Sequence, residues 1–320
     1  MCFHVYFDTN AYNRVADQFS VSEIKNLRET LDGRGWSLCL SPVNIIEFLQ
    51  NAHCSRREEL VSVAQNLCDS RLLVEPEALV VNFIVGKTLD DRVSDMALSS
   101  LFSESDLAAT WRDISLHPCK TFYFNREDLR RFDLSRSLHA FFHAHFSRGE
   151  NLSSVCRGLS VSDSDIEVML RAATEDRRRM SVPSERVPSI CQHTRLLVAA
   201  VFCVGCTPFP TAVDRYWQRI GVTDSSKRIH ETSDRLSFVY EEGPIRAMGA
   251  LMAWQTTKKY NAGNFFDCYH MVYLPHVDVF VTDDEGFHSF QSAFPDAESL
   301  RCLRTLEVFL AELDSEKSSA

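Results

Sequence analysis

The two ends of the chain alternate short apolar runs with longer segments whose apolar residues recur at helical spacing. The clearest runs, rich in β-branched and aromatic residues, are residues 5–7, 36–41 and 277–281. Between the first two, Leu27 and Leu31 lie on one face of a helix expected over residues 11–34. Strands that alternate with helices in this way predict right-handed crossovers and a mainly parallel sheet covered on both faces.

Further elements extend this pattern. We expect helices at residues 43–49, 57–68, 245–258, 265–274 and 306–313, and strands at 71–74 and 299–303. Pro42 suits the first turn of the helix that follows it, and Asn264 is suited to cap the helix that contains Asp267. The pattern predicts a doubly wound α/β fold, a Rossmann-like arrangement of three layers.

Amphipathic helical segments dominate the middle of the chain, without an internal repeat or a low-complexity run. We therefore expect three segments: residues 1–78 and 244–320 as the two halves of one α/β domain, and residues 79–243 as a largely helical insertion between them.

Composition indicates a soluble globular protein. The chain has 320 residues, of which 45% are hydrophobic, and this suffices for one large domain or two ordinary ones. The longest apolar run, residues 196–206, is too short to span a bilayer, and no leader-type sequence stands at the N-terminus. The number of cysteines is odd, at 11. We expect a cytoplasmic protein that has no membrane partner and holds mostly reduced thiols.

The net charge of −10 argues against a protein that grips a long duplex through its phosphates. It does not exclude a nuclease, because metal ions bound by carboxylates can supply positive charge locally.

Four acidic residues follow strand-like runs or lie early in helices: Asp8, Glu47, Asp267 and Asp284. Ligands of open α/β sheets bind outside the carboxyl ends of the strands, so Asp8 and Asp284 are expected to face a site. Each acid also has a structural interpretation. Asp8 or Thr9 can cap the next helix, Glu47 can pair with an arginine or lie at a solvated edge, and Asp267 can complement a helix dipole. If the four acids converge, their repulsion requires protons or cations, and oxygen ligands in that number suit Mg²⁺ or Mn²⁺.

Four motifs together resemble the PIN-domain nucleases. They are Phe-Asp-Thr-Asn from Phe7, Ser-Pro followed by Glu47, Asn-x-x-Asp from Asn264, and Val-Thr-x-Asp-x-x-Phe from Val281. The resemblance covers residues 1–85 and 244–313 and leaves the insertion outside it.

The resemblance implies a metal-dependent endonuclease, usually acting on RNA, in which Asp8, Glu47, Asp267 and Asp284 hold one or two metal ions. Five further residues are expected to orient ligands or water around them: Thr9, Asn10, Asn264, Thr282 and Asp283. Asp283 and Asp284 are adjacent, and the family spacing favours Asp284 as the ligand.

Several other features compete for a function. Gly86-Lys87-Thr88 imitates the end of a P-loop, but Val81 stands where the first glycine would be. His139, His143 and His145 are more typical of a helix face than of a metal site. A zinc site at Cys191, His193, Cys203 and Cys206 matches no established spacing. Two sets of basic residues are candidates for contacting substrate phosphate: Lys258 and Lys259, and Arg177, Arg178 and Arg179, which lie near Arg171 and Arg186. A solvated helix face also explains the arginines, and the C-terminus of the preceding helix also explains the lysines.

The sequence thus predicts an endoribonuclease that hydrolyses phosphodiester bonds in RNA, or in single-stranded DNA, with water activated by Mg²⁺ or Mn²⁺. A toxin, a defence effector and an RNA-processing enzyme would share these residues, and the insertion can bind a protein partner or a second copy. The alternatives are a non-catalytic PIN-like binding module and a phosphohydrolase acting on a small substrate.

Overall fold

The structure, a computed structural model, describes residues 3–68, 72–88, 90–96, 101–102, 126–158, 162–164, 211–235, 243–261, 263–293 and 300–315. None of the helices in these ranges is both long enough and apolar enough to cross a bilayer. The cysteines in these ranges form no disulfide with one another: Cys39, Cys54, Cys68, Cys156, Cys268 and Cys302.

The chain divides into two compact units. Unit 1 comprises residues 1–75, 100–125 and 273–320, and unit 2 comprises residues 76–99 and 126–272. This division differs from the three segments expected from sequence, because residues 244–272 belong to unit 2. There, α15 (Gly243–Gln255) packs on α5 (Pro76–Thr88) and on α16 (Asn264–His270).

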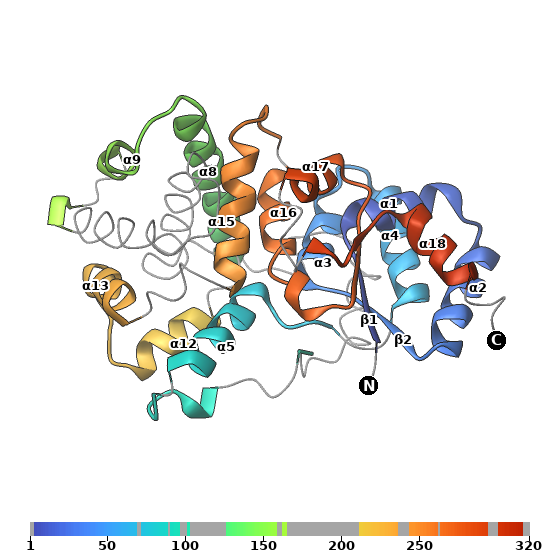
Figure 1. Cartoon of the computed structure of the whole chain (residues 1–320), viewed down its shortest axis with the longest axis horizontal. Coiled ribbons are helices and arrows are strands. Elements are labelled where there is room, and N and C mark those ends of the chain that lie inside the picture. Colours follow the sequence, from blue (N-terminus) through green and yellow to red (C-terminus); the bar gives the residue numbers. More distant parts are fainter. Residues whose placement is uncertain are drawn as a thin grey trace. The chain divides into compact units, whose positions relative to one another are not determined.

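Unit 1 contains a four-stranded sheet in the order β2-β1-β3-β4, and all its strand pairs are parallel. The strands are β1 (Phe3–Phe7), β2 (Trp36–Cys39), β3 (Val279–Val281) and β4 (Leu303–Arg304). Val5 pairs with Val279, and Phe7 pairs with Val281. The expected α/β class with a parallel sheet is therefore confirmed, and Figure 1 shows β1 beside β2.

The helices of unit 1 follow the expected alternation. They are α1 (Thr9–Gln18), α2 (Val21–Gly33), α3 (Pro42–Gln50), α4 (Cys54–Leu67), α17 (Glu285–Ala293) and α18 (Leu306–Ser315), with a 3₁₀ turn, η3 (Leu274–His276). The single helix expected over residues 11–34 is wrong. The chain breaks at Phe19, and Ser20 and Glu23 form a reciprocal capping box that starts α2.

Alternate residues of the central strand face opposite sides of the sheet. Val5 and Phe7 belong to a core built with α1, α2, α3, α4 and α18. Tyr6 lies with Phe280 on the other side, where its ring is 5.3 Å from that of Tyr273 and Phe280 contacts Phe287 of α17. Apolar side chains thus cover the sheet on both faces.

Two expected strands are shorter than predicted. In place of a strand over residues 71–74, Leu72 makes an isolated parallel bridge to Leu40 at the end of β2. The strand expected over residues 299–303 is limited to β4, which begins at Leu303. Both segments lie at an edge of the sheet, where few neighbours extend the pairing.

Every element described in unit 2 is helical. Beyond α5, α15 and α16 these are η1 (Ser94–Met96), α8 (Arg126–Ser147), α9 (Leu152–Gly158), α12 (Thr211–Arg219) and α13 (Ser225–Arg235). The helix expected over residues 265–274 ends earlier, at His270. Its N-cap is Gly263 and not Asn264, and no side chain caps it.

Candidate active site

Asp8 directly follows β1 and is 2% exposed. Its Oδ1 accepts a hydrogen bond from the backbone N–H of Ala11 at 2.8 Å, so the expected helix cap is present. Its Oδ2 accepts a hydrogen bond from the Thr282 hydroxyl at 2.6 Å. Because β2 lies on one side of β1 and β3 on the other, Asp8 and Thr282 stand at the switch point of the sheet, where open α/β folds bind ligands.

Asp284 lies two residues beyond Thr282 and caps α17 in the same manner. Its Oδ1 accepts from the backbone N–H of Gly286 at 2.5 Å, and its Oδ2 accepts from the Asn10 amide at 3.3 Å. The backbone N–H of Asp284 donates to the Thr282 hydroxyl oxygen at 3.0 Å. Thr282 therefore joins Asp8 to Asp284 through one hydroxyl group.

Asp283 makes a different set of contacts. Its Oδ1 forms an ion pair with Arg14 at 2.7 Å and accepts from the backbone N–H of Leu306 at 3.2 Å. These contacts tie the end of β3 to α1 and to the start of α18. Of the two adjacent acids, Asp284 is thus the one joined to Asp8 and Asn10.

Glu47 projects from α3 and is half-buried. Its Oε2 accepts a short hydrogen bond from the Thr9 hydroxyl. Ser41 and Asn44 form a buried capping box that starts α3, and the Asn44 amide also donates to the Phe7 carbonyl at 3.1 Å. These bonds hold the start of α3 against the carboxyl end of β1.

The three residues that follow β1 therefore include one acid and contact two others of unit 1. Asp8 is the first acid, Thr9 contacts Glu47, and Asn10 contacts Asp284. Two of these acids, Glu47 and Asp8, affect the pKa of the buried Tyr6 phenol. Burial raises its pKa, the Ser41 hydrogen bond lowers it, and the negative charges of Glu47 and Asp8 raise it further.

The carboxylate oxygens of the three acids and the nearby threonine hydroxyl oxygens are of the type that Mg²⁺ and Mn²⁺ prefer as ligands. Thr282 contacts both Asp8 and Asp284, whereas Thr9 contacts Glu47 and Asn10 contacts Asp284. Within the described ranges, no three His, Cys, Asp or Glu side chains are grouped closely enough to form a metal site.

Asp267 belongs to unit 2, in the first turn of α16. Its Oδ2 accepts a hydrogen bond from the Gln255 amide at 3.2 Å, a contact that no sequence motif had indicated. In the sequence, Gln255 is distinguished only as a polar residue at the end of a mostly apolar helix. The convergence of Asp267 with the acids of unit 1 stays a prediction.

The histidines of α8 have structural partners in unit 2. His143 Nε2 lies 3.0 Å from the Gln255 carbonyl oxygen, and His145 Nδ1 lies 2.8 Å from Glu150. His139 contacts the Cys268 sulfur at 3.6 Å. The helix-face interpretation therefore accounts for them better than a metal site does.

Of the remaining basic and zinc candidates, Lys258 and Lys259 lie in the described residues and the others do not. Lys258 and Lys259 are exposed just after α15, and the Lys258 ammonium lies 5.0 Å from the ring centre of Trp254. Two sets lie outside the described residues: the basic cluster of Arg171, Arg177, Arg178, Arg179 and Arg186, and the zinc candidates Cys191, His193, Cys203 and Cys206.

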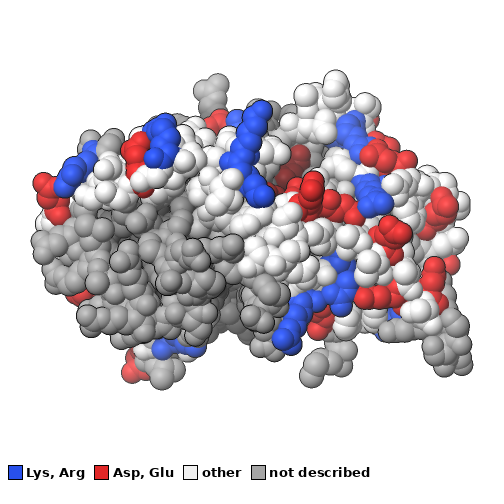
Figure 2. All heavy atoms as spheres, turned by 45° about the horizontal axis from the view of Figure 1, so that its top comes forward, with Lys and Arg blue, Asp and Glu red and all other residues white. Residues whose placement is uncertain are grey.

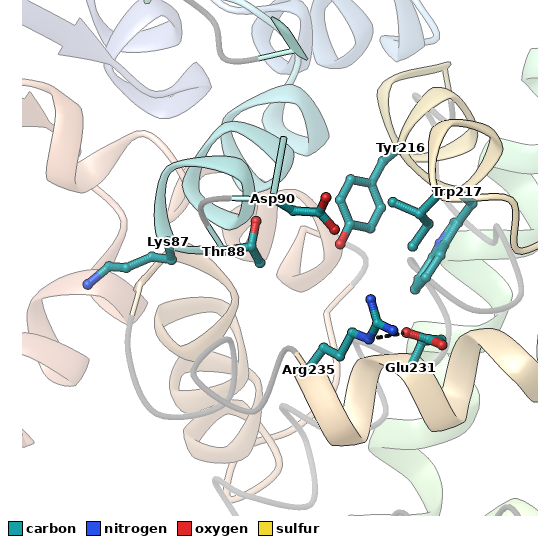
Figure 3. Close-up of a pocket in the computed structure, with 8 residues that line it drawn as sticks. Lys87, Thr88, Asp90, Tyr216, Trp217, Glu231 and Arg235 are labelled. Carbon is teal, nitrogen blue, oxygen red and sulfur yellow. Dashed lines mark ion pairs between the residues drawn. The ribbon is translucent and has the colours of Figure 1, made fainter. Parts of the chain in front are cut away.

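Gly86-Lys87-Thr88 forms the C-terminal end of α5, whereas a P-loop lies at a helix N-terminus. Lys87 and Thr88 line a cavity of 540 Å³ in unit 2, shown in Figure 3. The other lining residues are Asp90, Tyr216, Trp217, Ile220, Glu231 and Arg235. Both acids of this cavity form ion pairs within the chain, Asp90 with Arg92 and Glu231 with Arg235. The charged residues of the lining, Lys87 and Arg235 against Asp90 and Glu231, balance, so the lining has no excess charge that would select an ionic ligand.

Comparison of the chain with protein-family models, with curated proteins and with solved structures finds no match. The functional argument therefore rests on the residues and their geometry.

Proposed function

We propose that the protein is a metal-dependent endoribonuclease of PIN-like type, whose site lies at the carboxyl ends of β1 and β3. The observation that supports this most is the hydrogen-bonded set Asp8, Thr282 and Asp284 at the switch point of a parallel sheet. Glu47 and Asn10 extend the set. A purely structural N-cap needs one carboxylate oxygen, whereas here each aspartate has its second oxygen turned to a neighbour across the sheet.

In the proposed reaction, a water molecule attacks a phosphodiester phosphorus in line with the 3′ oxygen that leaves. When bound, Mg²⁺ or Mn²⁺ would supply Lewis acidity that lowers the pKa of water and positive charge that offsets the negative charge of the reaction. Asp8, Glu47 and Asp284 would hold the ion, and Asp267 is the fourth ligand that the resemblance implies. Thr9, Asn10 and Thr282 would orient the carboxylates of Glu47, Asp284 and Asp8, respectively, through the hydrogen bonds described above.

Substrate phosphates require cationic contacts outside the acid cluster. Lys258 and Lys259 are exposed, and we assign them this role together with Arg177, Arg178 and Arg179. Acidic and basic side chains are interspersed on the face shown in Figure 2. This distribution favours a short, flexible substrate such as single-stranded RNA over a long duplex. As the setting of this activity we propose the cytoplasm, where a toxin or a defence effector would act on RNA.

The test compares three single substitutions that each remove one negative charge. Asp8→Asn and Asp284→Asn change the proposed site. Asp278→Asn is the matched control, because Asp278 is exposed at the opposite end of β3, where it accepts the backbone N–H of His4 at 2.7 Å. The purified proteins are incubated with total RNA and Mn²⁺ or Mg²⁺, and the cut positions are mapped.

We expect the wild type and Asp278→Asn to cleave RNA only when the metal is present, and both site variants to lose at least about 100-fold in rate. Mn²⁺ should also raise the unfolding temperature of the wild type and of Asp278→Asn but not of the site variants. Equal behaviour of wild type and Asp8→Asn would contradict the proposal and favour a binding module. Faster hydrolysis of a small phosphate ester than of any oligonucleotide would favour a small-substrate phosphohydrolase.

A further inference from the structure

The cavity of 540 Å³ in unit 2 has the size and the mixed lining of a small-molecule site. Its walls come from the end of α5, from the segment between α5 and η1, and from α12 and α13. Cavities that bind small molecules typically measure about 300–1,000 Å³ and combine apolar walls with a few placed polar groups. The polar groups of this lining therefore indicate which ligand it would accept.

The hydroxyl of Tyr216 faces this cavity. Tyr216 is only 4% exposed, and its ring centre lies 5.1 Å from that of Trp217. Among the residues that the structure describes, none forms a hydrogen bond with the Tyr216 hydroxyl. Figure 3 shows the phenol pointing into the space between Asp90 and the ion pair of Glu231 with Arg235. A hydroxyl in a buried position costs free energy unless it is hydrogen-bonded, so this group is placed to bond a molecule in the cavity.

The Tyr216 phenol is a hydrogen-bond donor at neutral pH. Its pKa is raised to about 12, first by burial and then by the negative charges of Asp90 and Glu231. The positive charges of Arg235 and Arg92 oppose this effect. The phenol therefore keeps its proton and can both donate and accept a hydrogen bond.

Two ion pairs place hydrogen-bond acceptors near the phenol without an excess of charge. Asp90 pairs with Arg92 at 2.7 Å, and Glu231 pairs with Arg235 at 2.8 Å. A carboxylate has about four acceptor positions, so an ion pair leaves it able to accept from a further N–H group. A ligand in this cavity would thus accept from Tyr216 and donate to a carboxylate, and it would need no charge of its own.

We propose that this cavity binds a nucleobase, either in a free nucleoside or in a flexible nucleic-acid strand. The edge of a base carries N–H donors beside carbonyl or ring-nitrogen acceptors, which matches a protonated phenol placed near carboxylates. Pockets that take up a single base combine such polar contacts with aromatic walls, as Tyr216 and Trp217 provide here. Because only residues of unit 2 take part, the inference does not rest on the proposed nuclease function.

The test is isothermal titration calorimetry of the full chain without added metal ions. The probes are adenosine, guanosine, cytidine and uridine, their 5′-monophosphates, short single-stranded RNA oligonucleotides, and glucose as a neutral polyol.

Three variants accompany the wild type. Tyr216→Phe removes the hydroxyl and keeps the ring, and Glu231→Gln replaces a carboxylate acceptor. Tyr260→Phe is the matched control, because Tyr260 lies in the same unit against the His143 ring, 5.0 Å away between ring centres, and does not line the cavity.

We expect at least one nucleoside to bind the wild type and Tyr260→Phe equally, and to bind Tyr216→Phe about 2–10-fold more weakly. Glu231→Gln should also weaken binding, and a 5′-phosphate should not strengthen it. If only the oligonucleotides bind and Tyr216→Phe weakens that binding, the ligand is a base within a strand. If Tyr216→Phe does not fold, the comparison of Glu231→Gln with Tyr260→Phe decides the question.

Three results would overturn the inference. The first is that neither the nucleosides nor the oligonucleotides bind more weakly to folded Tyr216→Phe and Glu231→Gln than to the wild type. The second is that glucose binds more tightly than every nucleoside, which would make the cavity a polyol site. The third is that Tyr260→Phe weakens binding as much as Tyr216→Phe does. None of these results bears on RNA cleavage, which Asp8→Asn and Asp284→Asn test separately.

Discussion

At the scale of single residues, the carboxylates of Asp8 and Asp284 each combine two tasks. One oxygen of each caps a helix and the other accepts from a side chain across the sheet, Thr282 for Asp8 and Asn10 for Asp284. Capping by itself stabilises a helix by about 1 kcal/mol, and it fixes the direction of the carboxylate as a by-product. A functional site can therefore be built on groups that the fold already needs.

Gly286 offers a test of Asp284 that leaves the carboxylate itself unchanged. A Cβ atom at position 286 would lie 2.6 Å from Asp284 Oδ1, so Gly286→Ala must displace that side chain. Alanine in a helix gains about 1 kcal/mol over glycine, and loss of the cap costs about the same, so the free energy of unfolding should change little. We expect RNA cleavage to fall at least about 10-fold, because the proposed metal ligand is moved.

The control for this substitution is Gly86→Ala in the exposed part of α5, where a Cβ atom meets nothing within 4 Å. It should keep full cleavage and add stability by urea denaturation. Wild-type cleavage by a folded Gly286→Ala would remove Asp284 from the site.

The residues of the proposed site differ in how far the sequence could indicate them. Asp8 and Asp284 follow apolar runs, so the sequence placed them at strand ends. The partner of Asp283 could not be read in the same way, because Arg14 lies 269 residues away and only folding brings the two together at 2.7 Å. Gln255 was missed for the same reason, since its hydrogen bond to Asp267 depends on the packing of α15 against α16.

At the scale of elements, the break between α1 and α2 shows how a local signal can be hidden by periodicity. Apolar residues continue at helical spacing through residues 11–34, and this favoured one helix. Ser20 and Glu23 nevertheless form a capping box, and the Phe19 backbone is extended. Two short helices replace one long one because Ser20 and Glu23 satisfy the free N–H groups of a new start. The edge strands were overestimated because apolar composition does not reveal whether a neighbouring strand is present.

Ser20→Ala tests this element directly. It removes the hydroxyl that accepts the Glu23 backbone N–H at 3.4 Å and donates to its carboxylate at 2.7 Å. We expect the free energy of unfolding to fall by about 1 kcal/mol in urea denaturation. Ser62→Ala, at an exposed position within α4, is the control and should be neutral or slightly stabilising. Equal effects of the two substitutions would show that the capping box contributes nothing.

At the scale of the whole molecule, the sequence predicted a parallel α/β sheet but not the division into units. From sequence, residues 244–272 look like a return to the sheet domain, because the alternation of helix and strand patterns resumes at Pro244. Only tertiary contacts assign α15 and α16 to unit 2. Helical periodicity reports that a face is buried and does not report against which partner.

The buried phenols link global stability to alkaline pH. Burial raises the pKa of Tyr12 well above its usual value, and the nearby Cys68 raises it further. Above about pH 10 the unfolded chain releases the Tyr12 proton while the folded protein retains it, so the free energy of unfolding falls as pH rises. Tyr12→Phe keeps the ring contacts with Phe7 and Phe48 and removes this proton.

We expect the stability of Tyr12→Phe to fall less steeply above pH 10, by up to about 1.4 kcal/mol per pH unit relative to wild type. Urea denaturation between pH 8 and pH 11 measures this difference. Parallel curves for the two proteins over that range would show that Tyr12 ionises with its ordinary pKa in the fold.

The pairing of β1 with β3 also sets an order of events during synthesis. The Asp8 carboxylate and the Thr282 hydroxyl that donates to it are separated by 274 residues, and both β1 and β2 are translated long before β3. One edge of β1 therefore stays unpaired until β3 emerges from the ribosome, and such an edge favours association with other chains. Asp284 follows β3, so the acids of unit 1 cannot meet until β3 has been translated, and a nascent chain with the proposed nuclease activity would spare the message that encodes it until then.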